Sequence, residues 1–312
     1  NQIELTADYF NNRRKSILLE RNTIPGVAGF HAKPWQNYGI VDNWGVDASL
    51  NARHDFGKVR VSARGTITFA RNKIVEYDEL KQLYDYQRIT GTRVNENTLY
   101  IAERLYTEDD FIRTQNPNGT YSYELRPGLP RNALQGTLGP GDIKYADLNH
   151  DGVIDERDIV YLGSSFPTIT GGGALVLNYK SWQLRTSLHF RLGHSIINMV
   201  RHDLEKMNNG NNQSKNALRR WRYEGDDTDV PRALWGTNYN SMGSSKFVED
   251  GSFLKIKDIS LNYRIPQRVC AKMGLTSALV GITTYNLFTF TSYTGQDPEV
   301  GVENGAYGLA ID

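Results

Sequence analysis

Apolar and polar residues alternate along three long stretches of this chain, at residues 44–56, 60–70 and 182–192. Because successive side chains of an extended strand point to opposite faces, each stretch predicts a β-strand with one apolar and one polar face. In residues 182–192 the apolar face would carry Trp182, Leu184, Leu188, Phe190 and Leu192, and the polar face Gln183, Arg185, Ser187, His189 and Arg191. These runs of 11 to 13 residues exceed the roughly 5–6 residues of most strands in globular proteins, whereas a tilted strand needs about 9–11 to cross a bilayer. The pattern therefore predicts an all-β fold, a transmembrane antiparallel β-barrel.

The same reading predicts seven strands, or nine if residues 97–123 add a pair. The seven are 3–10, 39–53, 58–71, 170–179, 182–192, 247–264 and 277–290. Short turns at 54–57 and 180–181 alternate with long segments at 73–168 and 193–246. Since bacterial barrels have short periplasmic turns and long extracellular loops, we expect both long segments to be extracellular.

Two short helices are expected on the second long segment. Residues 196–207 space their apolar side chains as in a helix, and residues 216–223 are a second candidate. Single-chain bacterial barrels have an even number of strands. The odd count therefore indicates that at least one strand lies outside this chain, beyond Asp312, and the chain itself reads as a piece of a longer protein.

Composition narrows the classes of protein further. The net charge of +1 gives no reason to expect nucleic acid or an anionic lipid surface as a partner. The mean hydropathy is −0.54, and no run of about 18 apolar residues predicts a transmembrane helix. The 18 tyrosines and 5 tryptophans suit the aromatic girdles of a barrel. The single cysteine, Cys270, is expected to be a small packing residue.

Residues 147–158 (DLNHDGVIDERD) follow the spacing of a calcium-binding loop. The candidate ligands are Asp147, Asn149, Asp151, the Val153 carbonyl, Asp155 (directly or through water) and Asp158. Gly152 would permit the sharp turn. The loop departs from the usual pattern in having Asp at its last position and no helix before it. We therefore expect one Ca²⁺, with Mg²⁺ less suited, against the alternative of a turn stabilised by its own side chains.

Basic side chains gather on the polar faces of the predicted strands. Candidates for lining a polar lumen are Arg60, Arg64, Arg185, His189 and Arg191. They could contact a solute, or they could solvate the interior and pair with a plug. No nucleophile–base set, carboxylate pair or histidine ligand pair stands out, so the sequence predicts neither an enzyme nor an organic cofactor.

Several blocks of the chain resemble the SusC/RagA family of TonB-dependent outer-membrane transporters, in that family's order. These blocks are residues 5–18, 38–47, 72–75, 140–155, 248–263 and 286–299. The resemblance implies that residues 1–312 are the C-terminal part of a barrel of about 22 strands. It also implies that the plug domain, the TonB-contacting segment and the closing strand lie outside this chain.

The resemblance implies an outer-membrane importer of nutrients, mostly oligosaccharides and sometimes peptides. Its partners would be a SusD-like surface lipoprotein, TonB and outer-membrane lipid. The alternative is a secreted β-rich carbohydrate-binding module with a calcium-stabilised loop, which should stay soluble without detergent.

Overall fold

The computed structural model describes residues 2–134, 137–299, 302–303 and 306–307. The chain divides into two compact units. Unit 1 comprises Asn1–Asp78, Ser164–Ile196 and Asp250–Asp312, and unit 2 comprises Glu79–Gly163 and Ile197–Glu249. Among the described residues, no helix combines the length and the apolar character needed to span a membrane.

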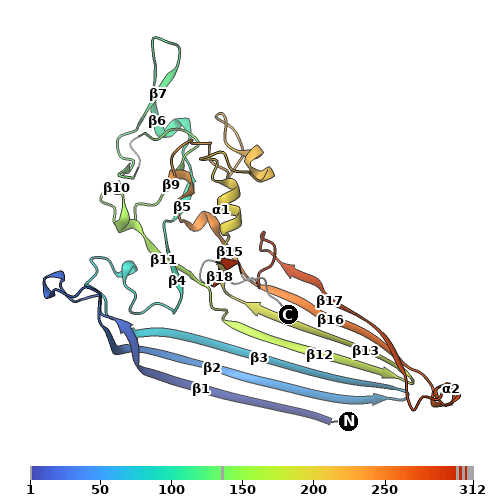
Figure 1. The fold of residues 1–312 in the computed structure, drawn as a ribbon. Coiled ribbons are helices and arrows are strands. Elements are labelled where there is room, and N and C mark those ends of the chain that lie inside the picture. The colour runs from blue at the N-terminus through green and yellow to red at the C-terminus, as the bar shows by residue number, and fades with distance from the viewer. Residues whose placement is uncertain (1, 135–136, 300–301, 304–305, 308–312) are drawn as a thin grey trace. The chain divides into compact units, whose positions relative to one another are not determined.

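Unit 1 is built on one seven-stranded antiparallel sheet whose spatial order follows the chain (Figure 1). Its strands are β1 (Gln2–Glu20), β2 (Trp35–Phe56), β3 (Val59–Glu76), β12 (Ile169–Tyr179), β13 (Trp182–Leu192), β16 (Phe253–Arg264) and β17 (Leu279–Thr291). Each strand pairs with the one that precedes it in this series. All seven predicted strands are therefore present, in an uninterrupted meander.

The predicted strand ends differ from the observed ones. β1, β2 and β3 contain 19, 22 and 18 residues, because backbone pairing continues where the side-chain alternation has already stopped. β16 begins at Phe253 instead of residue 247. Residues 248–250 belong instead to a short strand, β15 (Val248–Asp250), which pairs with β14 (Ser195–Ile197).

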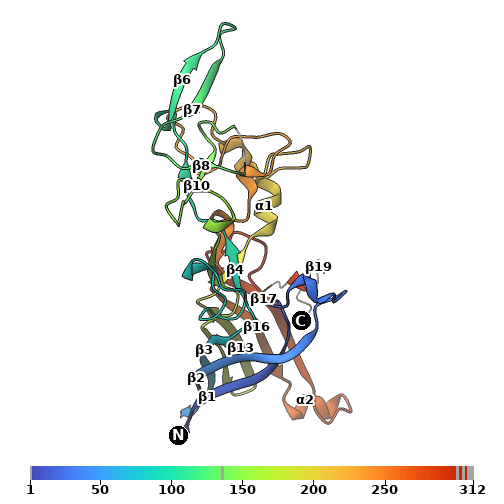
Figure 2. The same ribbon diagram turned by 90° about the vertical axis from the view of Figure 1, so that its left-hand side faces the viewer.

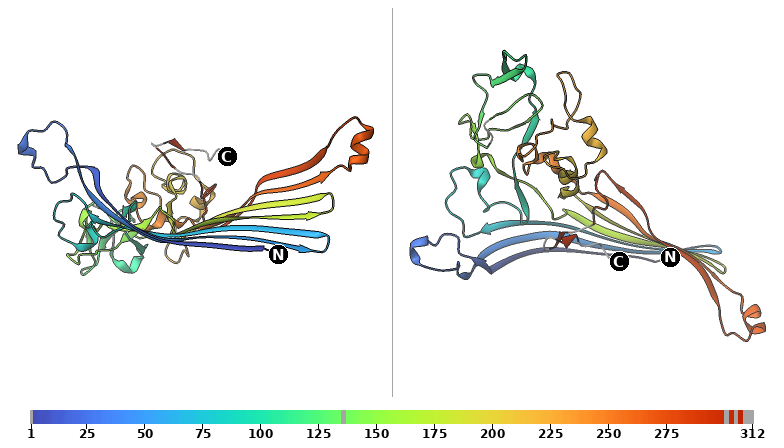
Figure 3. Two further views of the ribbon diagram at one scale, coloured as in Figure 1. Left: turned by 90° about the horizontal axis from the view of Figure 1, so that it is seen from below. Right: turned by 45° about the horizontal axis from the view of Figure 1, so that its top comes forward.

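The short connections of the sheet lie together at one end (Figure 3). They join β2 to β3, β12 to β13, and β16 to β17. The last of them contains the short helix α2 (Gln267–Lys272), in which Cys270 is fully buried. Gly57 and Lys180 adopt positive φ angles of 61° and 52°, as tight turns require.

Unit 2 holds short elements around a small apolar core. Its strands are β4 (Glu96–Leu99), β5 (Ala102–Leu105), β6 (Phe111–Gln115), β7 (Tyr121–Leu125), β8 (Arg131–Asn132), β9 (Ile143–Tyr145), β10 (Val153–Ile154) and β11 (Val160–Ser164). The core consists of Tyr100, Ile143, Tyr145, Ile154 and Tyr239. Almost all buried apolar residues of the described part lie in this unit, and Phe253 and Cys270 are the exceptions.

Three predictions for the long segments need correction. The strands within 97–123 exist, but β6 and β7 pair with each other as a hairpin (Figure 2) and none joins the seven-stranded sheet. The helix predicted over 196–207 is limited to α1 (Met199–Glu205), because residues 195–197 form β14. The second candidate is a 3₁₀ helix at Lys215–Arg219.

Candidate functional site

The antiparallel register aligns side chains of the sheet into rows that cross all seven strands. One row contains Leu5, Leu50, Gly65, Gly173, Leu188, Ile256 and Phe288. The adjacent row contains Glu4, Asn51, Arg64, Ala174, Ser187, Asp258 and Tyr285. Apolar and polar rows alternate, so the sheet has one apolar and one polar face, as the sequence predicted.

Large apolar side chains of the described residues lie exposed on the apolar face of the sheet. Ile3 is 78% exposed and Ile282 is 69% exposed, and Trp182 and Leu188 also lie open. A water-soluble sheet would bury such a face in a core. An apolar outer face on strands of at least 11 residues is the arrangement of a membrane-spanning barrel wall.

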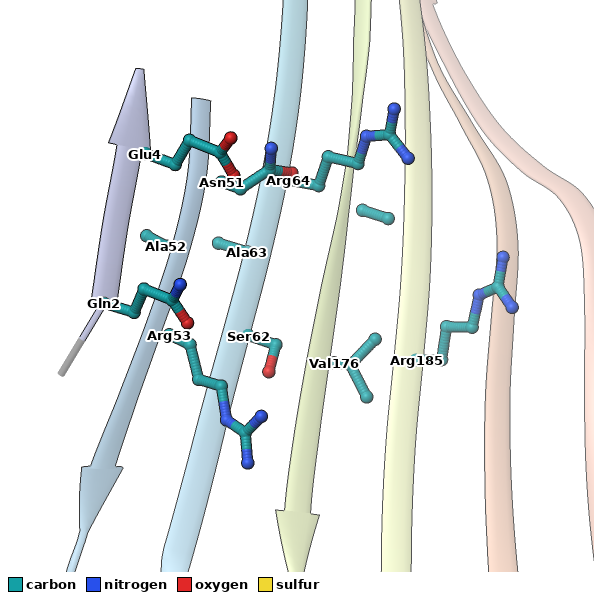
Figure 4. Close-up of a pocket in the computed structure, with 11 residues that line it drawn as sticks. Gln2, Glu4, Asn51, Ala52, Arg53, Ser62, Ala63, Arg64, Val176 and Arg185 are labelled. Atoms are coloured by element: carbon teal, nitrogen blue, oxygen red, sulfur yellow. The ribbon is translucent and has the colours of Figure 1, made fainter. Parts of the chain in front are cut away.

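A cavity of about 390 Å³ lies on the polar face of the sheet (Figure 4). It follows two polar rows from β1 to β13, together with Ala52 and Ala63 of the row between them. Its lining residues are Gln2, Glu4, Asn51, Ala52, Arg53, Ser62, Ala63, Arg64, Ala174, Val176 and Arg185. The hollow forms because β12 contributes only the small side chains of Ala174 and Val176 between the long arginines of β3 and β13.

The structure separates the predicted lumen-lining residues into three groups. Arg64 and Arg185 share the cavity. Arg60 is outside it, and its Nε donates to Asp55 Oδ1 at 2.7 Å next to the β2–β3 turn. His189 and Arg191 lie in polar rows nearer the other end of the sheet, opposite Lys255 and Phe253. Contact with a solute stays a prediction for all five.

An ionic cluster on the polar face was missed by the sequence analysis. The Lys255 side chain is 2% exposed, and its ammonium donates to Asp297 Oδ2 at 2.8 Å and to Glu299. Lys257 Nζ donates to Glu299 Oε2 at 3.2 Å. Residues 292–299, here called the strap, are thereby held against the face that carries Lys255.

A β-bulge brings both lysines to this cluster. Ser187 pairs with Asp258 and Leu188 with Ile256, so Lys257 is the extra residue of β16. An extra residue locally redirects side chains, which lets Lys257 reach the same carboxylate as Lys255. Burial raises the pKa of Glu299, but hydrogen bonds and charges from the two lysines outweigh it and lower that pKa overall.

The side chains of the predicted calcium loop are engaged with the chain itself. Asp147 Oδ2 accepts from the Gly152 amide at 2.9 Å, and Asp151 Oδ1 accepts from the Val153 amide at 2.9 Å. Asp158 is fully buried and accepts from the amides of Leu148 and Asp155. No group of three or more His, Cys, Asp or Glu side chains in the described part is arranged to hold a metal ion.

Two features of this loop bear on its fit to a cation. Asp147 Oδ1 is buried and has no hydrogen-bond partner, which is the condition of an oxygen available to a cation. Asp155, in contrast, is turned toward Arg157, whose hydrogen bonds hold the pKa of that carboxyl below its usual range. Asp155 would have to leave Arg157 to bind an ion directly. The calcium site stays a prediction.

A second buried carboxylate in unit 2 is structural. Asp142 is fully buried and accepts from Arg232 Nε and Nη2, each at 2.7 Å, and from the Asn240 amide at 2.9 Å. Both carboxylate oxygens of Asp142 accept hydrogen bonds from the chain itself. Asp142 therefore fixes the loop around residues 139–143 instead of offering a ligand site.

No family model matches the chain. Curated relatives are TonB-dependent receptor P3 of Formosa agariphila, 27% identical over 97% of this chain, and TonB-dependent receptor SusC of Bacteroides thetaiotaomicron, 24% identical over 96%. The chain spans 29% and 28% of their lengths. Among solved structures, the RagAB peptide importer in its closed-closed state is 21% identical over 96% of this chain and 31% of that chain, with a TM-score of 0.69.

The sheet, its exposed apolar face and the structural match define the class. This chain is a segment of a transmembrane antiparallel β-barrel. The relatives confirm the resemblance to the SusC/RagA type of TonB-dependent transporter over nearly the whole chain. They are receptors and importers, in agreement with the expectation that this chain is not an enzyme.

Proposed function

We propose that this chain is part of an outer-membrane importer that takes up nutrient oligomers with energy delivered through TonB. The observation that carries the proposal is the two-faced sheet. Its apolar face suits lipid, and its polar face carries a cavity with exposed arginines that suit a solute path. The named relatives, which include TonB-dependent receptors and a peptide importer, support the same function.

The other parts of the transport system would lie in the longer protein and in its partners. We propose that residues 1–312 are its C-terminal barrel part, with a plug domain and the TonB-contacting segment before them. A SusD-like surface lipoprotein would act with the long segments on the extracellular side. The substrate would be an oligosaccharide or a peptide.

An uptake assay tests this function. Cells that carry the full-length gene, a deletion of it, or the gene without a functional TonB would be given labelled oligosaccharide and peptide mixtures. We expect uptake of at least one oligomer class to need both the receptor and TonB. Equal uptake by all three strains would contradict the proposal. The alternative, a secreted binding module, predicts that the protein is found in the medium and stays soluble without detergent.

We also propose that the loop at residues 147–158 binds one Ca²⁺ in a structural role. The unpartnered, buried Asp147 Oδ1 supports this, as does the spacing of Asp147, Asn149, Asp151 and Asp158. Asp158 is held in place by two backbone amides. Crowded carboxylates repel one another, so an ion would stabilise this arrangement.

A further inference from the structure

We propose that the polar cavity of the sheet is a binding site for anionic groups repeated along an oligomer, such as the carboxylates of an acidic peptide or an acidic oligosaccharide. This inference deepens the proposed import function and rests on it. It names the substrate chemistry that the cavity would recognise.

The first argument is the charge of the cavity. Its charged lining residues are Glu4, Arg53, Arg64 and Arg185, so three guanidinium groups face one carboxylate and the formal net charge is +2. All three arginines are exposed. Guanidinium groups are well matched to carboxylate, phosphate and sulfate oxygens, which they can bind through paired hydrogen bonds.

The second argument is that, within the described part of the chain, none of these arginines forms an ion pair as close as those of neighbouring basic groups. The neighbouring Arg60 pairs with Asp55, and Arg13 pairs with Asp42 at 2.6 Å. Lys255 and Lys257 are paired with the strap. No such ion pair involves Arg53, Arg64 or Arg185 among the residues described. Among the described residues, these three guanidinium groups are therefore not held by a carboxylate at ion-pair distance.

The third argument is geometric and favours an extended ligand. Figure 4 shows Arg53 extending over β3, Arg64 across β12 toward β13, and Arg185 toward β16, so their guanidinium groups are spread across the face. Arg64 and Arg185 stand on strands separated by β12, and neighbouring strands lie about 4.8 Å apart, so their backbones are roughly 10 Å from each other. A small anion such as sulfate could reach one of these groups at a time. An oligomer with a negative group on successive units could reach all three.

The small residues of β12 complete the site. Ala174 pairs with Arg64, and Val176 pairs with Arg185. A long side chain at either position would fill the space between the arginines. The hollow is therefore a property of the sequence of β12, and it leaves room for a ligand backbone beneath the guanidinium groups.

Binding of matched peptides to the full-length protein in detergent tests the proposal. The probes are pentaglutamate and pentaglutamine, which differ in charge and share a backbone, and pentagalacturonate with its methyl ester as the carbohydrate pair. We expect each acidic probe to bind about tenfold tighter than its neutral partner, as one or two charge-assisted hydrogen bonds would give. The preference should weaken as salt rises, because exposed charges are screened.

Variants separate this site from other basic groups. The double variant Arg64→Gln/Arg185→Gln should lose the preference for acidic probes, and Arg64→Lys/Arg185→Lys should retain part of it. Arg60→Gln is the matched control, because Arg60 stands on the same strand outside the cavity and is already neutralised. Heat-dependent gel mobility would confirm that each variant is a folded barrel.

Each outcome decides the question. Equal binding of acidic and neutral probes by the wild type would overturn the proposal, and would indicate that acidic side chains elsewhere in the longer protein occupy the arginines. A preference that survives in the Gln double variant would also overturn it. Because detergent binding needs neither cells nor TonB, a failure here with intact uptake would refute only the anionic site. Binding with no uptake would refute the import function.

Discussion

At the scale of single residues, glycines on the apolar face decide how closely the strands approach. A Cβ at Gly171 would lie 2.4 Å from the Thr66 carbonyl oxygen and 2.5 Å from the Phe190 ring. Phe190 is its cross-strand partner, and on the opposite, polar face a phenyl ring lies against Gly45 in the same way, from its partner Phe10. An aromatic ring laid over a glycine restores the apolar surface that the missing side chain would leave open.

We expect Gly171→Ala to destabilise the barrel by about 1–3 kcal/mol, because the neighbouring atom is backbone and cannot move aside. Gly65→Ala is the control, since the nearest atom to a Cβ there is the Gly172 oxygen at 4.0 Å. Urea unfolding of the full-length protein, followed by tryptophan fluorescence, would measure both. Equal midpoints for the two variants would show that the close contact at Gly171 carries no cost.

The two faces of β13 make a second prediction at this scale. Leu188→Arg places a charge on the apolar face. Near the bilayer midplane it should lower the free energy of unfolding of the barrel by about 2–4 kcal/mol. Ser187→Arg, one residue away on the polar face, is the control, because Asp258 lies opposite it. If the Ser187 variant were the less stable of the two in lipid, the assignment of the faces would be reversed.

At the scale of elements, the strap is held by two lysines that lie on a single strand, β16. Lys255→Met should destabilise the protein by about 3 kcal/mol, the lower end of the range for breaking a buried ion pair, since Asp297 is 35% exposed. Lys257→Met is the matched control, because Lys257 is 29% exposed and also pairs with Glu299. Thermal unfolding in detergent would compare them, and protease cleavage within residues 292–299 would report release of the strap.

If Lys255→Met and Lys257→Met shift the unfolding temperature equally, the buried lysine has no special part in holding the strap. If the temperature falls only for Lys255→Met while cleavage stays absent, then the strap is fixed by other contacts. Both readouts must change together for the description above to hold.

The second prediction at this scale is that Ca²⁺ bound at the loop of residues 147–158 stabilises the protein. Ca²⁺ added to chelator-treated protein should raise its stability by about 2.7 kcal/mol at a hundred times the dissociation constant. Asp151→Asn/Asp158→Asn should abolish that increase, and exposed Asp227→Asn should retain it. An unfolding temperature that does not respond to Ca²⁺ would reduce the loop to a turn built from its own hydrogen bonds.

Elements also show what the sequence could and could not predict. The period of two located all seven strands of the sheet and both faces of β13, because lipid and lumen select opposite side chains at every second position. The same period could not tell that β6 and β7 pair with each other, since alternation carries no information about the partner. The ion pairs of the strap could not be predicted either, because Lys255 and Asp297 are 42 residues apart in the sequence and meet only after folding.

Among the candidate site residues, Arg64 and Arg185 were named from their faces alone, and the register then placed them at one cavity. Arg53 was missed as a lining residue, although it stands on a predicted strand. The reason is that β2 ends near it, and the end of a strand is where alternation is weakest as a signal. The hollow itself depends on Ala174 and Val176, whose small size has no meaning until their neighbours are known.

At the scale of the whole molecule, the edges of the sheet matter most. Within the described part of the chain, β1 and β17 each pair with one neighbour, so the 19 residues of β1 present a row of backbone amides and carbonyls that no second strand of the sheet meets. In hydrocarbon each unsatisfied group costs several kcal/mol. In water, such an edge is a template for pairing with another chain.

The open edges therefore limit how this part of the sheet can fold and insert into a membrane. The strands cannot enter the bilayer one hairpin at a time and wait there. The strands must be kept from pairing with neighbouring copies until flanking strands pair with both edges. Insertion would then be all-or-none and would depend on a chaperone. Residues 1–312 synthesised alone should accumulate as fibrillar or amorphous β-aggregate, because both edge strands would pair with other copies.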